Sequence, residues 1–189
     1  MQKLRVMKES LPFLFLCAAG GAAAGLVLGQ MEYIFELVPG LIALVPAMID
    51  MRGNIASTMG SRLGSAHHLG LIDKGWRSSI VSENIKATVT LSLFVATFLP
   101  LIFWATSLLP FVESLASFRA LAAIYLIAIT TGLTTGFLLS FISYFAVILS
   151  IKYDLDPDNL SGPALTTVGD VLTLLLLFLW AYLIGGAIM

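Results

Sequence analysis

The chain has 189 residues and a formal net charge of -1, and only 11% of its residues are charged whereas 59% are hydrophobic. Soluble domains carry roughly a quarter charged residues. This composition, with a mean hydropathy of +0.99, therefore excludes an ordinary soluble enzyme and a disordered chain. The sequence has neither a basic arm nor a basic patch interleaved with aromatic residues, which argues against nucleic acid as a partner.

Five apolar stretches, taken in chain order, predict an all-α integral membrane protein with five transmembrane helices. Residues 10–31, 87–112 and 120–151 contain no charged side chain, and at about 1.5 Å per residue each can cross a hydrocarbon core of roughly 30 Å. Two other stretches are interrupted, one by Asp50 and Arg52, the other by Asp170. We expect a single transmembrane domain over 1–189, with helices at about 10–31, 37–61, 83–111, 119–151 and 162–187.

The first stretch follows a basic segment, as a secretory signal peptide would. The apolar run continues past Gly25 without a convincing cleavage site before Glu32, which favours a retained helix. Cys17 is the only cysteine, so neither a disulfide within the chain nor a cysteine-based metal site is expected.

The positive charges predict the orientation. With the N terminus in the cytoplasm, every Lys and Arg except Arg119 falls on the cytoplasmic side, as the positive-inside rule requires. Five crossings then place the C terminus outside. An odd number of helices cannot form an inverted repeat within one chain, so a symmetric pore would need two chains.

Two predicted helices carry small residues at four-residue steps, which allow helices to approach closely. These residues are Gly21, Gly25 and Gly29 in the first helix and Gly132, Gly136 and Ser140 in the fourth. We favour packing within the chain over a dimer seam as their role.

The second predicted helix concentrates polar residues. If it is helical, spacings of four, seven and eleven residues place a carboxylate, an amide and two hydroxyls on one face. These residues are Asp50, Asn54, Ser57 and Ser61. Gly53 lies beside them without a side chain, and Pro39 and Pro46 remove backbone donors, so carbonyl oxygens are also free to face a ligand.

Carboxylate, amide, hydroxyl and carbonyl oxygens are the hard donors that Mg²⁺ and Ca²⁺ prefer. The alternative is an ion pair of Asp50 with Arg52 or Arg62 near the inner interface. The grouping favours a cation site.

The fifth predicted helix carries a second intramembrane acid. Asp170 shares a face with Thr166 and Thr173, with Thr167 adjacent, and no charged residue follows it. An isolated acid in such a segment is a functional candidate, either ionised against a cation or protonated in a relay. The alternative is a structural hydrogen bond to Thr or Asn on another helix.

Two connections are polar. Residues 62–82, rich in glycine, serine, histidine and charge, are expected to form the main cytoplasmic linker. In the second connection, Asp154, Asp156 and Asp158 alternate as in a calcium loop, but Pro157 breaks that pattern. We expect an acidic cytoplasmic rim or a solvated turn there.

Two segments resemble a known family. Residues 46–54, with the sequence PAMIDMRGN, and residues 61–63, SRL, look like the second-helix signature of the MgtE and eukaryotic solute-carrier magnesium transporters. Residues 156–159, DPDN, with Gly162–Pro163, Thr166–Thr167 and Asp170, resemble the entry to the fifth helix of that family. The order and spacing of the two motifs also match.

The resemblance implies a homodimer that transports divalent cations, with the second and fifth helices lining a pore at the subunit interface. Asp170 would be the central acid that holds hydrated Mg²⁺, with Asn54 and Gly53 lining the pore. Mg²⁺ is usually held by one or two carboxylates and keeps several waters, which fits such a site. Mg²⁺ would be the transported ion rather than a resident cofactor.

The chain departs from the bacterial pattern in two respects. Arg52 stands where bacterial members have a glycine, although the eukaryotic branch carries a basic residue there. We expect Arg52 to point to lipid headgroups or to an acidic partner, because in the pore it would repel a divalent cation. We expect no counterpart of the cytosolic regulatory domains of the bacterial family.

We therefore expect a multi-pass cell-membrane transporter in contact with lipid, and not an enzyme. One alternative is the substrate-binding membrane subunit of an energy-coupling-factor-type importer, which would not explain two intramembrane acids flanked by motifs. A phospholipid-head-group transferase would need several Asp with Gly and Arg on adjacent turns, which this sequence lacks.

Overall fold

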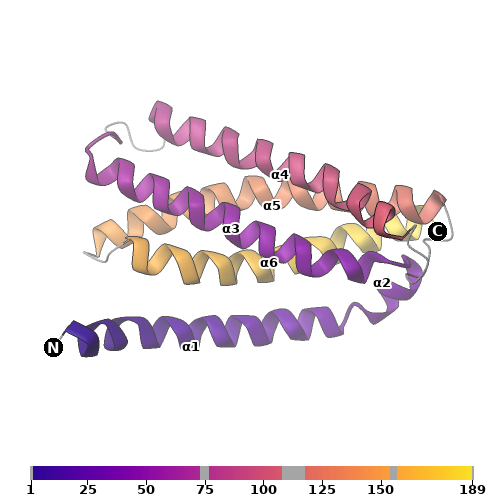
Figure 1. The fold of residues 1–189 in the computed structure, drawn as a ribbon, viewed down its shortest axis with the longest axis horizontal. Helices are drawn as coiled ribbons and strands as arrows, with labels where there is room; N and C mark the ends of the chain where they lie inside the picture. Colours follow the sequence, from indigo (N-terminus) through magenta and orange to yellow (C-terminus); the bar gives the residue numbers. More distant parts are fainter. Residues whose placement is uncertain (1, 73–76, 108–117, 154–156, 189) are drawn as a thin grey trace.

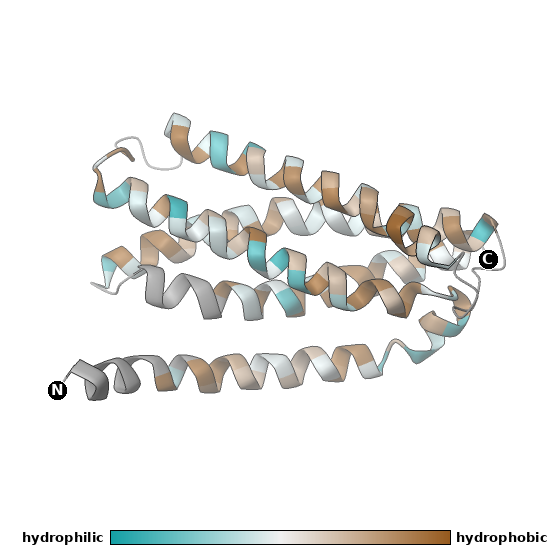
Figure 2. Ribbon diagram, in the orientation of Figure 1, coloured by the Kyte–Doolittle hydropathy of each residue, from teal (hydrophilic) through white to brown (hydrophobic). Residues whose placement is uncertain are grey.

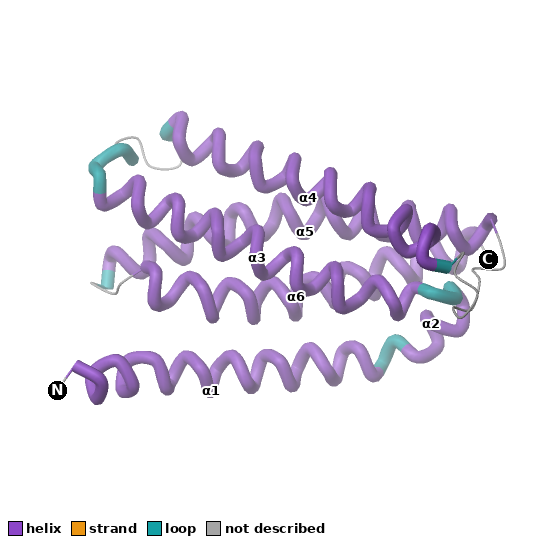
Figure 3. Tube along the Cα trace, in the orientation of Figure 1, coloured by secondary structure: helices purple, strands orange, loops and turns teal. Residues whose placement is uncertain are grey.

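The computed structural model describes the backbone of residues 2–72, 77–107, 118–153 and 157–188, and the side chains of these residues except 2–10, 13 and 157–164. The described residues form six helices and no strand, which confirms the all-α prediction (Figure 1, Figure 3). The helices are α1 (Gln2–Gly29), α2 (Glu32–Leu37), α3 (Leu41–His68), α4 (Ser79–Thr106), α5 (Phe118–Lys152) and α6 (Pro157–Ile188).

The second predicted helix begins later than expected. The short helix α2 stops at Leu37, and α3 begins at Leu41. Pro39 has no backbone N–H to donate, and Gly40 has a φ of 87°, a left-handed conformation that costs glycine little. The chain therefore turns between the two helices.

The same helix also ends later than expected. α3 continues to His68, through the first part of the segment predicted to be a linker. Leu63, in this extension, is fully buried and belongs to a core cluster with Val81 of α4 and Tyr144 of α5. Burial of this apolar side chain accounts for the extra turns.

The last helix begins earlier than predicted. α6 begins at Pro157, and proline is favoured in the first turn because its missing N–H would have no helical partner there. Asp154, Asp156 and the side chain of Asp158 lie outside the described residues. The acidic rim therefore stays a prediction.

The five long helices run along one bundle, with the start of α1 and the end of α6 at opposite ends (Figure 1). α3, α5 and α6 pack against one another, α4 covers α3 and α5, and α1 packs mainly on α6. The largest apolar core lies where α2 joins α3, and it includes Ile34, Leu44, Met48, Ile127 and Leu177.

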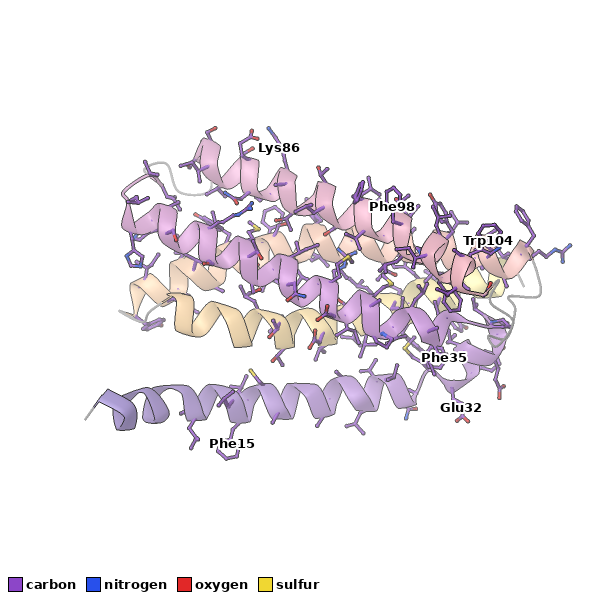
Figure 4. The ribbon with its side chains drawn as sticks, in the orientation of Figure 1. Phe15, Glu32, Phe35, Lys86, Phe98 and Trp104 are labelled. Carbon is purple, nitrogen blue, oxygen red and sulfur yellow. The ribbon has the colours of Figure 1, made fainter. Side chains whose placement is uncertain are left out.

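Hydrophobic residues recur along the helices of the bundle (Figure 2), and many large hydrophobic side chains among them are exposed. Within the described residues, α4, α5 and residues 165–188 of α6 are long and apolar enough to cross a membrane, and Leu14–Gly29 of α1 is a shorter apolar helix. Phe15 of α1 and Phe98 and Trp104 of α4 point away from the neighbouring helices (Figure 4). Such a surface suits contact with lipid; five crossings and their orientation stay predictions.

The two rows of small residues differ in their surroundings. Side chains added at Gly132 and Gly136 of α5 would collide with α4 and α3, so this row packs within the chain as expected. Side chains added at Gly21, Gly25 and Gly29 of α1 would meet nothing within 4 Å. The expectation of packing within the chain is therefore wrong for α1.

Candidate functional site

A hollow of about 270 Å³ lies between α3 and α6, partway along the bundle. Both intramembrane acids predicted from the sequence line it. The lining residues are Pro46, Ile49, Asp50, Gly53 and Asn54 of α3 and Thr166 and Asp170 of α6.

The α3 side of the hollow contains a carboxylate held by an amide. Asp50 and Asn54 lie one turn apart, and the Asn54 Nδ2 donates a hydrogen bond of 3.2 Å to the Asp50 Oδ2. This contact places both side chains on one face, as their spacing predicts. No ion pair joins Asp50 to Arg52 or Arg62 in the part of the chain that the structure describes.

The α6 side approaches α3 very closely. A Cβ at Gly53 would lie 3.1 Å from the Thr166 Cγ2 and 3.3 Å from its Cβ, and a Cβ at Gly169 would lie 3.9 Å from the Gly53 backbone nitrogen. The missing side chain at Gly53 therefore lets α6 reach α3, which places Asp170, one turn beyond Thr166, opposite Asp50 across the same hollow.

The structure places three other predicted site residues away from the hollow. The Ser57 Oγ donates to the Asn54 carbonyl at 3.2 Å, and the buried Thr173 donates to the Gly169 carbonyl at 2.6 Å. Thr167 lies against Gly20 of α1. Their helical spacing suggested one shared face, but the actual neighbours decide which hydroxyls face the hollow.

Two lining residues were not among the predicted ligands. Pro46 and Ile49 line the hollow on the side of α3 toward Leu41. Pro46 lies four residues before Asp50, so the same helical spacing that linked Asp50 to Asn54 could have found it. Because proline donates no hydrogen bond, the Ile42 carbonyl one turn earlier has no helical donor.

The expectation that Arg52 points to lipid headgroups or to an acidic partner is wrong. Its side chain is only 1% exposed and lies against α5, where a Cβ at Gly132 would lie 2.9 Å from its Nη2 and one at Gly136 3.5 Å from its Nη1. It therefore reaches neither lipid headgroups nor, among the described residues, an acidic partner. It also does not line the hollow.

The donors facing the hollow suit a hydrated cation better than a stripped one. The described residues contain no group of three His, Cys, Asp or Glu close enough to hold a metal ion directly. A water molecule takes about 30 Å³, so a volume of 270 Å³ holds an ion with six waters. Mg²⁺ keeps several waters when carboxylates bind it, whereas a closed protein cage would need more ligands than these.

We expect Gly53→Ala to reduce Mg²⁺ uptake into proteoliposomes by about fivefold. The new methyl would lie 3.1 Å from the Thr166 Cγ2, and forcing the two helices apart costs on the order of 1 kcal/mol. Thr166→Ser removes that methyl and keeps the hydroxyl, so the double variant should recover most of the rate. Mg²⁺ uptake into proteoliposomes measures both; an unrescued double variant would contradict the steric explanation.

Comparison with known proteins decides the family. The model of the MgtE family, described as a divalent cation transporter, matches residues 45–180. The chain belongs to the MgtE family. The matched region covers most of α3 and of α6, and it includes every residue that lines the hollow.

This MgtE-family chain is similar to several animal proteins. It is 30% identical to solute carrier family 41 member 3 of Mus musculus over 89% of its length, and 27% identical to member 2 of Gallus gallus over 88%. Member 2 of Homo sapiens is 26% identical over 88%. These matches cover 35%, 29% and 29% of the relatives, so the chain spans about a third of their length. No solved structure matches the chain.

Proposed function

We propose that this MgtE-family chain moves divalent cations, Mg²⁺ foremost, across a cell membrane through the hollow between α3 and α6. The observation that carries the proposal is the pair of carboxylates, Asp50 and Asp170, that face one hollow from two helices. Two negative charges in an apolar bundle attract a divalent cation strongly, because little water screens them.

Transport rather than tight storage fits the arrangement. A pathway must bind its ion firmly enough to admit it and weakly enough to release it. An ion that keeps its waters contacts Asp50 and Asp170 through those waters, so the protein need not replace the whole hydration shell. Selectivity then depends on the size and spacing of the hydrated ion.

The proposed assembly is a homodimer in which α3 and α6 of two copies border one pathway. A five-helix chain has no inverted repeat, and a twofold pair would supply two copies of Asp50 and of Asp170. We propose five crossings with the N terminus in the cytoplasm, since this orientation leaves only Arg119 among the basic residues outside.

The test is Mg²⁺ influx into proteoliposomes loaded with a fluorescent Mg²⁺ indicator. The chain should produce influx well above that of protein-free liposomes, and a membrane potential that is negative inside should increase the rate. Imposed H⁺ and Na⁺ gradients separate passive from coupled flux. Influx equal to protein-free liposomes under all of these conditions would overturn the proposal.

Asp50→Asn should reduce Mg²⁺ influx by about tenfold without abolishing it. Asparagine keeps the size and one acceptor oxygen but loses the charge, and Asp170 still faces the hollow. The concentration of Mg²⁺ at half-maximal rate should rise, which a concentration series measures. Complete loss of influx in Asp50→Asn, with influx retained when Asp170 is replaced, would reverse the order of the two acids.

A further inference from the structure

Arg52 carries a buried positive charge that does not face the hollow. The side chain is 1% exposed, and its Nε, Nη1 and Nη2 have no hydrogen-bond partner among the described residues. A guanidinium keeps its proton in proteins, so the charge persists inside the bundle. An ionised group in an apolar interior is very unfavourable unless an opposite charge compensates it.

The space around the guanidinium is filled by neighbouring helices. A Cβ at Gly132 would lie 2.9 Å from the Arg52 Nη2 and 2.5 Å from the Ala96 Cβ. A Cβ at Gly136 would lie 2.7 Å from the Ser92 Oγ and 3.5 Å from the Arg52 Nη1. The three guanidinium nitrogens are buried from solvent. Neither water nor dissolved ions therefore screen this charge locally.

The charge that compensates Arg52 must come from farther away. Among the described side chains of α3, α4, α5 and α6, the acids are Asp50, Glu83 and Asp170. Glu83 lies exposed at the start of α4 and pairs with Lys86 at 3.0 Å. The other two acids, Asp50 and Asp170, both line the hollow. They are therefore the counter-charges that the bundle offers to Arg52.

Only the thickness of α3 separates Arg52 from the hollow. Residues two apart on a helix do not share a face, so Arg52 lies behind α3 as seen from Asp50. Gly53, the next residue, lines the hollow itself. A helix with its side chains is about 10–12 Å across. At this distance, and at an effective dielectric constant of about 20, one unit charge changes the binding of another by roughly tenfold.

We propose that Arg52 weakens the binding of divalent cations in the hollow by about 100-fold, from behind α3, and so allows a bound ion to leave. This inference rests on the proposed function. The repulsion scales with the charge of the ion, so tenfold for a monovalent cation becomes about 100-fold for Mg²⁺. In the empty hollow the same arginine compensates part of the charge of Asp50 and Asp170, which explains its burial without a direct partner.

Matched variants test whether the charge of Arg52 weakens Mg²⁺ binding. In Arg52→Met, the Mg²⁺ concentration that half-saturates both thermal stabilisation and influx should fall by about 100-fold. The maximal influx should also fall, because the ion leaves more slowly. Arg52→Lys keeps the charge and should stay near the unmodified chain. A merely structural defect would raise the half-saturating concentration or leave it unchanged, and either result in Arg52→Met would overturn the inference.

Arg62→Met is the control for a general effect of surface charge. Arg62 is an exposed arginine of the same helix, ten residues further on and so about 15 Å along α3. Salt and water screen a charge at such a place. Its removal should leave the half-saturating Mg²⁺ concentration unchanged. A decrease as large as that in Arg52→Met would overturn the assignment to Arg52.

A measurement without Mg²⁺ separates this inference from the proposed function. Asp170→Asn is made in the unmodified chain and in the Arg52→Met background, and thermal unfolding is followed by tryptophan fluorescence. If the acids compensate Arg52, Asp170→Asn should lower the midpoint by about 3 °C more where Arg52 is kept. Arg52→Gln serves if Arg52→Met does not fold. Equal shifts in both backgrounds would overturn the inference, whereas unequal shifts without Mg²⁺ influx in any variant would overturn only the proposed function.

Discussion

Replacement of Asp170 by alanine should reduce Mg²⁺ influx to the level of protein-free liposomes, a loss of about 100-fold or more. Asp170 lines the hollow from α6, and no charged residue follows it in that helix to replace it. Loss of an ionic ligand in an apolar bundle costs about 3 kcal/mol or more, which corresponds to this factor.

The variant should remain folded, because it removes a charge from an apolar helix. Size-exclusion chromatography should therefore show the same assembly as the unmodified chain. Glu83→Gln is a suitable control, since Glu83 lies outside the hollow, at the start of α4, and pairs with Lys86 at 3.0 Å on the exposed surface. Its influx should be unchanged. Influx near the unmodified rate in Asp170→Ala would exclude Asp170 from the pathway.

Gly132→Val should lower the stability of the bundle strongly, and more than the same change at a glycine that meets no neighbour. A Cβ at this position would lie 2.5 Å from the Ala96 Cβ and 2.9 Å from the Arg52 Nη2, so α4 and α5 would have to separate. Overpacking of this kind typically costs about 1–3 kcal/mol. Thermal unfolding in detergent should show a midpoint lowered by several degrees.

Gly21→Val provides the matched control. It makes the same chemical change in an apolar helix, but nothing lies within 4 Å of the added Cβ. Its midpoint should stay close to that of the unmodified chain or rise slightly, because glycine is a poor helix former. Equal losses in both variants would show that close packing at Gly132 does not explain the effect.

The sequence predicted which polar residues share one face of a helix better than it predicted which residues of other helices lie against that face. Asp50 and Asn54 share a face because a helix brings residues four apart together, and the isolation of Asp170 was visible as one charge in a long apolar run. The spacing in the fifth predicted helix, which is α6, wrongly placed Thr173 at the hollow. A buried threonine donates to a carbonyl of its own helix when no ligand faces it.

The position of Arg52 could not be predicted for a related reason. Its place in α3 indicates that it points away from Asp50, but a helical wheel does not show which helix lies on that side. Only tertiary packing shows that Gly132 and Gly136 of α5 leave room for a guanidinium there. The same holds for α1, where a row of glycines meets no neighbour.

The contact between Arg52 and the two glycines of α5 links positions far apart in the chain. A long side chain at 52 needs small residues at 132 and 136, whereas a glycine at 52 would leave space that larger residues could fill. These three positions should therefore vary together among homologous sequences. Within the family, an arginine at this position of α3 would then indicate small residues on the facing side of α5, and so predict the packing of α5 as well as a charge in α3.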